Sequence, residues 1–273
     1  YWTLVLARVV AGGFGGVGAA ATLVIVGDVF HDSRRGTAMG VLMTAFSVAS
    51  IAGVPVGLFI ADRLGSWQAP FAVLAGLGVL VLVLMQIVLT PLPRPAGDHP
   101  AGAVRILSRY LTVMLRPTHL LAFLFMTALM FGSFTIWPPA PLYLTNNVGM
   151  NQDHLEYVYI CGGIATMPLL SWIGKLSDRF GKRLLFRILA TITIAPLLLM
   201  TNLPAGLSLP WILAATTFLM VATSGRMVPA MALITASADP AERGSFLSIN
   251  SAVQQTALAL AAVLGGAMMG QPK

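Results

Sequence analysis

The sequence predicts an all-α polytopic membrane protein. Of its 273 residues, 57% are hydrophobic and only 9% are charged. A soluble globular domain carries about 25% charged residues, so this chain lacks the charge needed to cover its surface in water. Its apolar residues gather in runs close to the roughly 20 residues that cross a bilayer as a helix. These observations exclude most soluble enzymes, coiled coils and disordered proteins.

Eight apolar runs are long enough to span the membrane. They cover residues 2–27, 37–61, 68–90, 119–143, 155–174, 184–201, 208–236 and 245–268. Each is predicted to be a helix, because backbone polar groups in lipid must be satisfied within the segment. We expect three helices in residues 1–90, a cytosolic linker at 91–118 and five helices in 119–273. The linker is rich in Pro and Arg, and its stretch around Tyr110 has the amphipathic pattern of a helix on the membrane surface.

The basic residues that give the net charge of +7 are concentrated in particular gaps between the apolar runs. Most Lys and Arg residues fall in alternate gaps between the runs, namely the gaps after the first, third, fifth and seventh. The intervening gaps and the C-terminus carry only Arg63 and Lys273, while Arg8 and Arg226 lie within runs. The positive-inside rule places the basic gaps in the cytosol. The basic charge therefore indicates orientation rather than binding of nucleic acid.

A short internal repeat relates the two ends of the chain. Arg35-Gly36 and Arg243-Gly244 each follow an acidic stretch and open a predicted helix. When these pairs are superposed, Gly57 falls on Gly265 at the far end of the following helix. Parallel repeats of this kind are common in secondary transporters.

The most specific motif lies between the fifth and sixth runs. It reads GKLSDRFGKR and contains Gly174, Asp178, Arg179, Gly181, Lys182 and Arg183. Glycines permit a tight turn, and the cations favour the anionic cytosolic surface. The segment resembles the "GxLaDrxGrk" loop of the major facilitator superfamily. The resemblance implies a twelve-helix fold with two pseudo-symmetric halves, and a conformational role for this loop. Because the copy here follows the long linker, the resemblance implies that the chain covers family helices four to eleven and is cut at both ends.

Two further stretches resemble motifs of drug and sugar efflux proton antiporters within this superfamily. Arg8 and Gly12 match an "RxxxG" pattern of the fourth helix, which implies a role for Arg8 in proton coupling. Snorkelling of Arg8 to the outer interface is the alternative. Gly53, Pro55 and Gly57 resemble the "GPxxGG" motif of the fifth helix, with departures at two positions. We expect these three residues to bend the helix and let neighbours approach, with plain helix packing as the alternative.

Several polar and aromatic side chains are candidates for a central substrate cavity. Arg226 lies too deep in its run for easy snorkelling, and a charge there usually faces a cavity or a partner. A structural hydrogen-bonding role is the alternative. Asn250 and Gln254 share one helix face and are predicted either to line the same cavity or to bind neighbouring helices.

Aromatic residues mark the end of the fourth run. Phe131, Phe134 and Trp137 precede a cluster of prolines at 138, 139 and 141, which must interrupt the helix. They are predicted to line the cavity near an outer gate, or to form an interfacial aromatic belt.

These features together predict a secondary active transporter rather than an enzyme. No metal spacing or catalytic constellation is visible, so we expect no cofactor and no metal. By resemblance the function is proton-coupled efflux of a small, drug-like or sugar-like organic molecule by alternating access, in a bacterial inner membrane. The expected partners are that substrate, protons and membrane lipids, with no nucleic acid, and the full-length protein is expected to be a monomer. An uptake symporter or facilitator, and a truncated protein that transports nothing, remain as alternatives.

Overall fold

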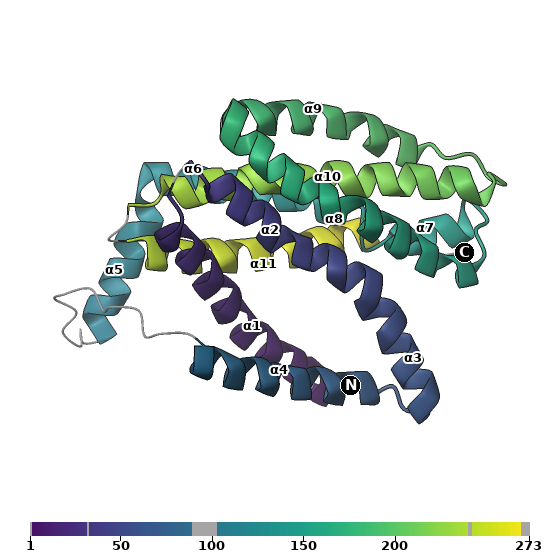
Figure 1. The fold of residues 1–273 in the computed structure, drawn as a ribbon, viewed down its shortest axis with the longest axis horizontal. Helices are drawn as coiled ribbons and strands as arrows, with labels where there is room; N and C mark the ends of the chain where they lie inside the picture. Colours follow the sequence, from purple (N-terminus) through teal and green to yellow (C-terminus); the bar gives the residue numbers. More distant parts are fainter. Residues whose placement is uncertain (1, 32, 89–102, 240–241, 269–273) are drawn as a thin grey trace.

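The computed structural model describes residues 2–31, 33–88, 103–239 and 242–268, and every regular element within these ranges is helical (Figure 1). The α-helices are α1 (Trp2–Val29), α2 (Arg35–Val48), α3 (Val54–Leu64), α4 (Ala69–Val88), α5 (Ala103–Leu115), α6 (Pro117–Phe134), α7 (Ala140–Asn146), α8 (Leu155–Phe180), α9 (Lys182–Thr201), α10 (Leu209–Ser237) and α11 (Arg243–Met268). A π-helical segment, η1 (Ala49–Gly53), joins α2 to α3, and a short 3₁₀ turn, η2 (Gln152–His154), precedes α8.

The predicted fold class is confirmed. Among the described residues, seven helical segments are long and apolar enough to cross a membrane, and α2, η1 and α3 together form one of them, Arg35–Leu64. The 28-residue helix α1 occupies the first predicted run. The predicted interruption of the run at 119–143 by its proline cluster is confirmed. α6 ends at Phe134, the chain turns, and α7 restarts at Ala140 with Pro141 in its first turn.

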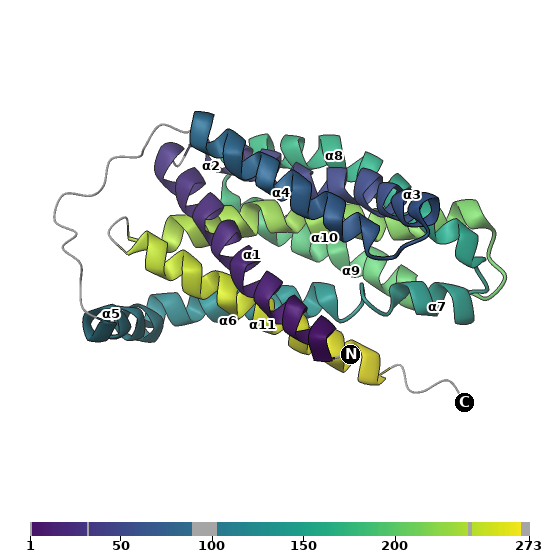
Figure 2. The same ribbon diagram turned by 90° about the horizontal axis from the view of Figure 1, so that it is seen from below.

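α10 is the central helix of the bundle. It packs against α1, α2, α6, α8 and α9, and its most apolar window is 56% buried, the largest fraction among the seven spans. Figure 2 shows the bundle from the side of α1 and α4, with α4 lying along its edge. The described side chains of α4 from Phe71 to Ile87 are all exposed, as expected of a helix that faces lipid or further protein.

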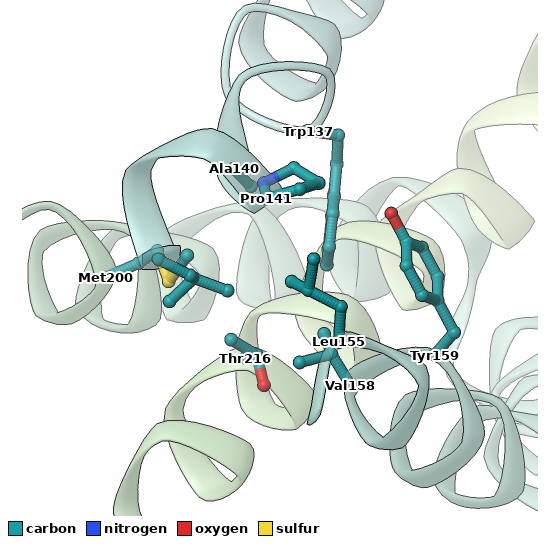
Figure 3. A pocket seen from close by; sticks show the side chains of 9 residues that line it. Trp137, Ala140, Pro141, Leu155, Val158, Tyr159, Met200 and Thr216 are labelled. Carbon is teal, nitrogen blue, oxygen red and sulfur yellow. The ribbon is translucent and has the colours of Figure 1, made fainter. Parts of the chain in front are cut away.

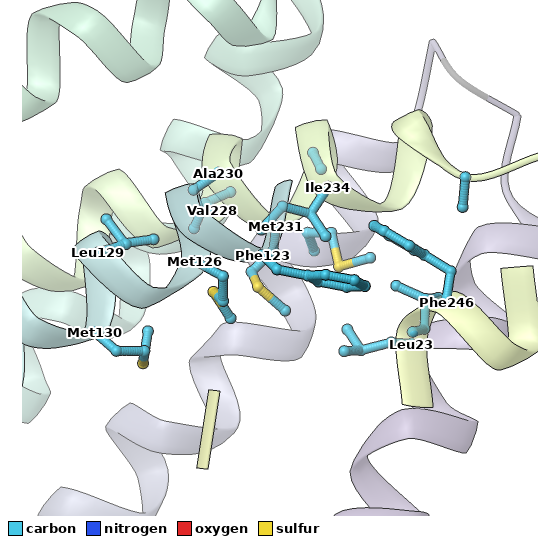
Figure 4. Close-up of a cluster of buried hydrophobic side chains, with 14 of the residues drawn as sticks. Leu23, Phe123, Met126, Leu129, Met130, Val228, Ala230, Met231, Ile234 and Phe246 are labelled. Atoms are coloured by element: carbon cyan, nitrogen blue, oxygen red, sulfur yellow. The ribbon is translucent and has the colours of Figure 1, made fainter. Parts of the chain in front are cut away.

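An apolar core fills the space between α1, α6, α10 and α11 (Figure 4). Phe123 of α6 stacks on Phe246 of α11 with ring centroids 5.3 Å apart. The buried ring of His119 lies 4.6 Å from Phe246, and its Nδ1 is 2.8 Å from the carbonyl oxygen of Val113 in α5. The predicted amphipathic linker helix is therefore present as α5, and its buried Val113 attaches it to the core.

α2 and α8 pack through glycines rather than through apolar side chains. A Cβ atom at Gly174 would lie 2.6 Å from the carbonyl oxygen of Gly36, and one at Gly40 would lie 2.6 Å from the carbonyl oxygen of Leu170. Seven residues farther along α2, the hydroxyls of Ser47 and Thr166 are 2.7 Å apart and share a buried hydrogen bond. These contacts bring the two backbones close together, as small residues do in membrane helix pairs.

The expected bend at Gly53, Pro55 and Gly57 takes a specific form. η1 ends at Gly53, and α3 carries Pro55 in its first turn. A proline has no N–H to donate to the preceding turn, so a π-helical segment next to it relieves the lost hydrogen bond. Close helix approach at the two glycines was the wrong expectation for the described part of the chain, because a Cβ at either would meet no atom within 4 Å.

We predict that Gly174→Ala destabilises the full-length protein by about 1–3 kcal/mol, because its new methyl group overlaps backbone that cannot move aside. Thermal unfolding in detergent measures this as a lowered Tm. Gly76→Ala is the matched control, since a Cβ at Gly76 in α4 meets nothing within 4 Å and should leave the Tm unchanged or raise it slightly. Equal Tm values for the two variants would contradict the packing described here.

Candidate functional site

The carboxylate of Asp178 closes the α2–α8 contact at the end of the bundle where the basic residues gather, called here the basic end. Its Oδ1 accepts a hydrogen bond of 2.8 Å from the backbone N–H of Gly36. Its Oδ2 accepts from the backbone N–H and the hydroxyl of Thr37, each at 2.7 Å. Asp178 thus caps the first turn of a helix more than 140 residues away in sequence, where free N–H groups and the helix dipole favour a negative charge.

The other residues of the loop motif shape the turn from α8 to α9. Gly181 has φ of +92°, which explains the glycine, since L side chains rarely adopt this conformation. The guanidinium carbon of Arg179 lies 5.4 Å from the centroid of the Phe180 ring. Lys182 and Arg183 open α9 at the basic end. The predicted loop is therefore a compact turn that presents Asp178 to α2.

Two arginines meet at one backbone carbonyl on α1. Arg35, the first residue of α2, donates through Nη2 to the carbonyl oxygen of Gly27 at 2.9 Å. Arg243, the first residue of α11, donates through Nη1 to the same oxygen at 3.1 Å and forms an ion pair with Asp28. The repeat predicted that these two arginines occupy equivalent positions, and both indeed open their helices. This cluster ties α1 and α2 to α11.

A second ion-pair cluster joins α6 to the α10–α11 connection. Arg116 Nη1 lies 3.0 Å from Asp239 Oδ2 and 2.8 Å from Glu242 Oε2. Sequence analysis did not identify this cluster.

Arg226 projects from the central helix toward α6. Its Nη2 donates to the hydroxyl of Ser133 at 2.8 Å. One turn farther from the basic end, the indole Nε1 of Trp137 lies 3.4 Å from the hydroxyl of Thr223. The α6–α10 seam, as we call this strip of Ser133, Trp137, Thr223 and Arg226, thus combines a cation, two hydroxyls and an aromatic ring.

The remaining predicted cavity residues are distributed unevenly. Phe131 and Phe134 are partly buried and pack against the apolar core. Asn250 is fully enclosed, and neither atom of its amide has a hydrogen-bond partner in the described structure. Gln254 is partly exposed. The side chain of Arg8 lies outside the described residues, so its role stays a prediction.

Two hollows lie at the end of the bundle opposite the basic end. The larger, about 240 Å³, lies between α7, α9 and α11 and is lined by Tyr143, Met200, Gly265 and others. The smaller, about 10 Å³, has room for about one water molecule. Figure 3 shows it between Trp137, Tyr159, Thr216 and Met200. Ser133 and Thr223 of the seam were not singled out from sequence.

Comparison with known proteins agrees with this architecture. The sequence model described as Major Facilitator Superfamily matches residues 1–136 and again residues 122–272. The chain belongs to the Major Facilitator Superfamily. Its twofold match also fits a molecule built from two related halves.

Named relatives from this superfamily are longer than this chain. The uncharacterized MFS-type transporter YbcL of Bacillus subtilis is 26% identical over 97% of the chain and 65% of its own length. The multidrug resistance protein MdtG of Dickeya zeae is 29% identical over 84% of the chain and 55% of its own length. The protein spinster homolog 1 of Rattus norvegicus is 30% identical over 51% of the chain and 28% of its own length.

We predict that Asp178→Ala destabilises the α2–α8 contact by about 1–3 kcal/mol, because two backbone N–H groups lose their acceptor. Asp178→Asn keeps one oxygen and should lose less. The Tm of the full-length protein in detergent measures both variants. Asp62→Ala at the opposite end is the control, with an effect within about 0.5 kcal/mol. A Tm for Asp178→Ala equal to that of the control would contradict the capping role.

Proposed function

We propose that this chain is the central part of a secondary active transporter that exports a small organic molecule by alternating access, in exchange for protons. The observation that supports this proposal is the place where the two halves of the chain contact each other. Among the residues whose burial the structure describes, α1 is buried only at Ala20, Leu23 and Gly27, near its basic end, and none of α3 is buried. α2 and α1 contact α8, α10 and α11 through the ion pairs, the Asp178 cap and the glycine packing described above.

This arrangement is that of a gate closed on the cytosolic side. The positive-inside rule places the basic end in the cytosol. The contacts there are hydrogen bonds, ion pairs and glycine packing, which can separate and re-form without unfolding either half. An alternating-access transporter rocks its two halves about a central site, so it needs contacts of this kind. The name of MdtG, a multidrug resistance protein, supports efflux as the direction.

Proton coupling requires a group that can take up and release the proton during transport. The acidic residues that the structure describes lie at helix ends or in turns. Two routes for proton coupling therefore remain. In the first, a carboxylate outside the described residues carries the proton at the centre of the membrane. In the second, an arginine and the exchanged substrate take the place of that carboxylate. Arg8 is our candidate for the second route. Integral membrane location follows from the spans, and we place the protein in a bacterial inner membrane.

Transport is tested with the full-length protein in inverted membrane vesicles. We expect at least one of three fluorescent probes, namely cationic ethidium, neutral Nile red and anionic fluorescein, to accumulate when an acid-inside pH gradient is imposed. A protonophore should abolish the accumulation. Equilibration of a probe that does not depend on the pH gradient would indicate a facilitator instead, and no movement of any probe would contradict the proposal.

The gate has its own test in a full-length variant with Cys161→Ser and Leu23→Cys. Leu23 is buried in the core behind the ion pair, so N-ethylmaleimide reaches it only when the basic end opens. We predict that Asp28→Asn speeds labelling about 10-fold, corresponding to about 1.4 kcal/mol lost from the closed state. Arg243→Gln should speed it more, because it also removes a bond to Gly27. Asp62→Asn is the control, and unchanged rates in both gate variants would refute the assignment.

A further inference from the structure

The α6–α10 seam contains a charge that the described protein does not neutralise. Arg226 lies 11 residues before the end of α10, about 16 Å along the helix axis. A charge this deep in a span is costly and normally faces the interior. Because α10 is surrounded by α1, α2, α6, α8 and α9, the exposed part of Arg226 faces the space between helices rather than lipid.

The bonds of Arg226 leave much of its guanidinium free. Its one hydrogen bond in the described structure goes to the neutral hydroxyl of Ser133, and its buried Nε has no partner. The carboxylates of Asp28, Asp239 and Glu242 pair with other arginines at the basic end. Within the described ranges, Arg226 thus forms no ion pair with any acidic residue.

Arg226 has different neighbours toward the two ends of the bundle. Toward the basic end the seam borders the buried core residues Met126, Leu129 and Val228 (Figure 4). Beside the guanidinium, Gly132 contributes no side chain, and a Cβ there would lie 3.5 Å from Nη2. Toward the opposite end lies Trp137, which is only partly buried. The cation thus lies between the buried apolar core and a partly exposed aromatic ring.

We propose that Arg226 binds the anionic group of the substrate, and that the transported molecules are small organic anions with an apolar or aromatic body. A guanidinium presents paired donors that match a carboxylate, phosphate or sulfonate. Ser133 orients the guanidinium by accepting one of its hydrogen bonds, and Trp137 offers an apolar surface for the body of the ligand. This inference rests on the proposed function, since it treats the seam as the place where a transporter holds its substrate.

A purely structural role for Arg226 makes a different prediction. As a hydrogen-bonding link between α6 and α10, Arg226 would affect stability but would not distinguish charged from neutral ligands. Three probes of matched shape separate the two roles: 2-naphthoate is an anion, 2-naphthamide is neutral and 2-naphthamidine is a cation. Their binding to the purified full-length protein in detergent is measured by isothermal titration calorimetry, with no proton gradient.

We expect 2-naphthoate to bind at least 10-fold more tightly than 2-naphthamide, and 2-naphthamidine to bind most weakly. Arg226→Gln should weaken 2-naphthoate about 10- to 100-fold, the effect of losing hydrogen bonds to a charged group, and should leave 2-naphthamide within about threefold. Arg226→Lys should restore part of the preference. Arg63→Gln removes the same charge from the end of α3 and should match the unaltered protein.

Two results would overturn the inference. One is equal, reversed or undetectable binding of 2-naphthoate relative to 2-naphthamide in the unaltered protein, which needs no variant to fold. The other is an Arg226→Gln protein that keeps the preference for the anion. The vesicle assay tests the proposed function separately from the anion site. Gradient-driven movement of ethidium without anion binding retains the transporter and rejects the anion site. Anion binding without movement of any probe retains the anion site and rejects the transporter.

Discussion

The carboxylate of Asp178 and the N-terminus of α2 form the contact on which the arrangement of the two halves depends. The turn at Gly181 places this carboxylate against two backbone N–H groups and a hydroxyl. The glycines at 36, 40 and 174 let the two helices approach until those bonds reach 2.7–2.8 Å. A side chain at one of these glycines would hold the backbones apart and separate the cap from its donors.

The sequence alone predicted the features that depend on length, composition and local motif. Helical spans follow from the thickness of the bilayer, and the orientation follows from the placement of the basic residues. Asp178 was recognised through its loop. The groups that Asp178 binds were not predicted, because Thr37 lies more than 140 residues away and no local pattern encodes that distance. Arg116 as the partner of Asp239 and Glu242 was missed for the same reason.

Local chemistry accounts for the other differences. The run at 119–143 contains a proline cluster that ends one helix, yet Pro141 also suits the first turn of α7, so the helix restarts. For the candidate site, Arg226 and Trp137 were found from sequence because charge and aromatic size are conspicuous in an apolar span. Ser133 and Thr223 were not, because hydroxyls that bond to their own helix turn are common throughout such spans.

The π-helical segment η1 changes how α2 and α3 relate to each other. A π turn accommodates an extra residue, and each residue of an α-helix turns the chain by about 100°. The faces of α2 that meet α8, marked by Gly40 and Ser47, therefore do not continue in line onto α3. The outer third of this span is free to present a different face to its surroundings from the inner two-thirds. A single-residue deletion within Ala49–Gly53 would rotate every side chain of α3 by about 100° relative to the contact with α8.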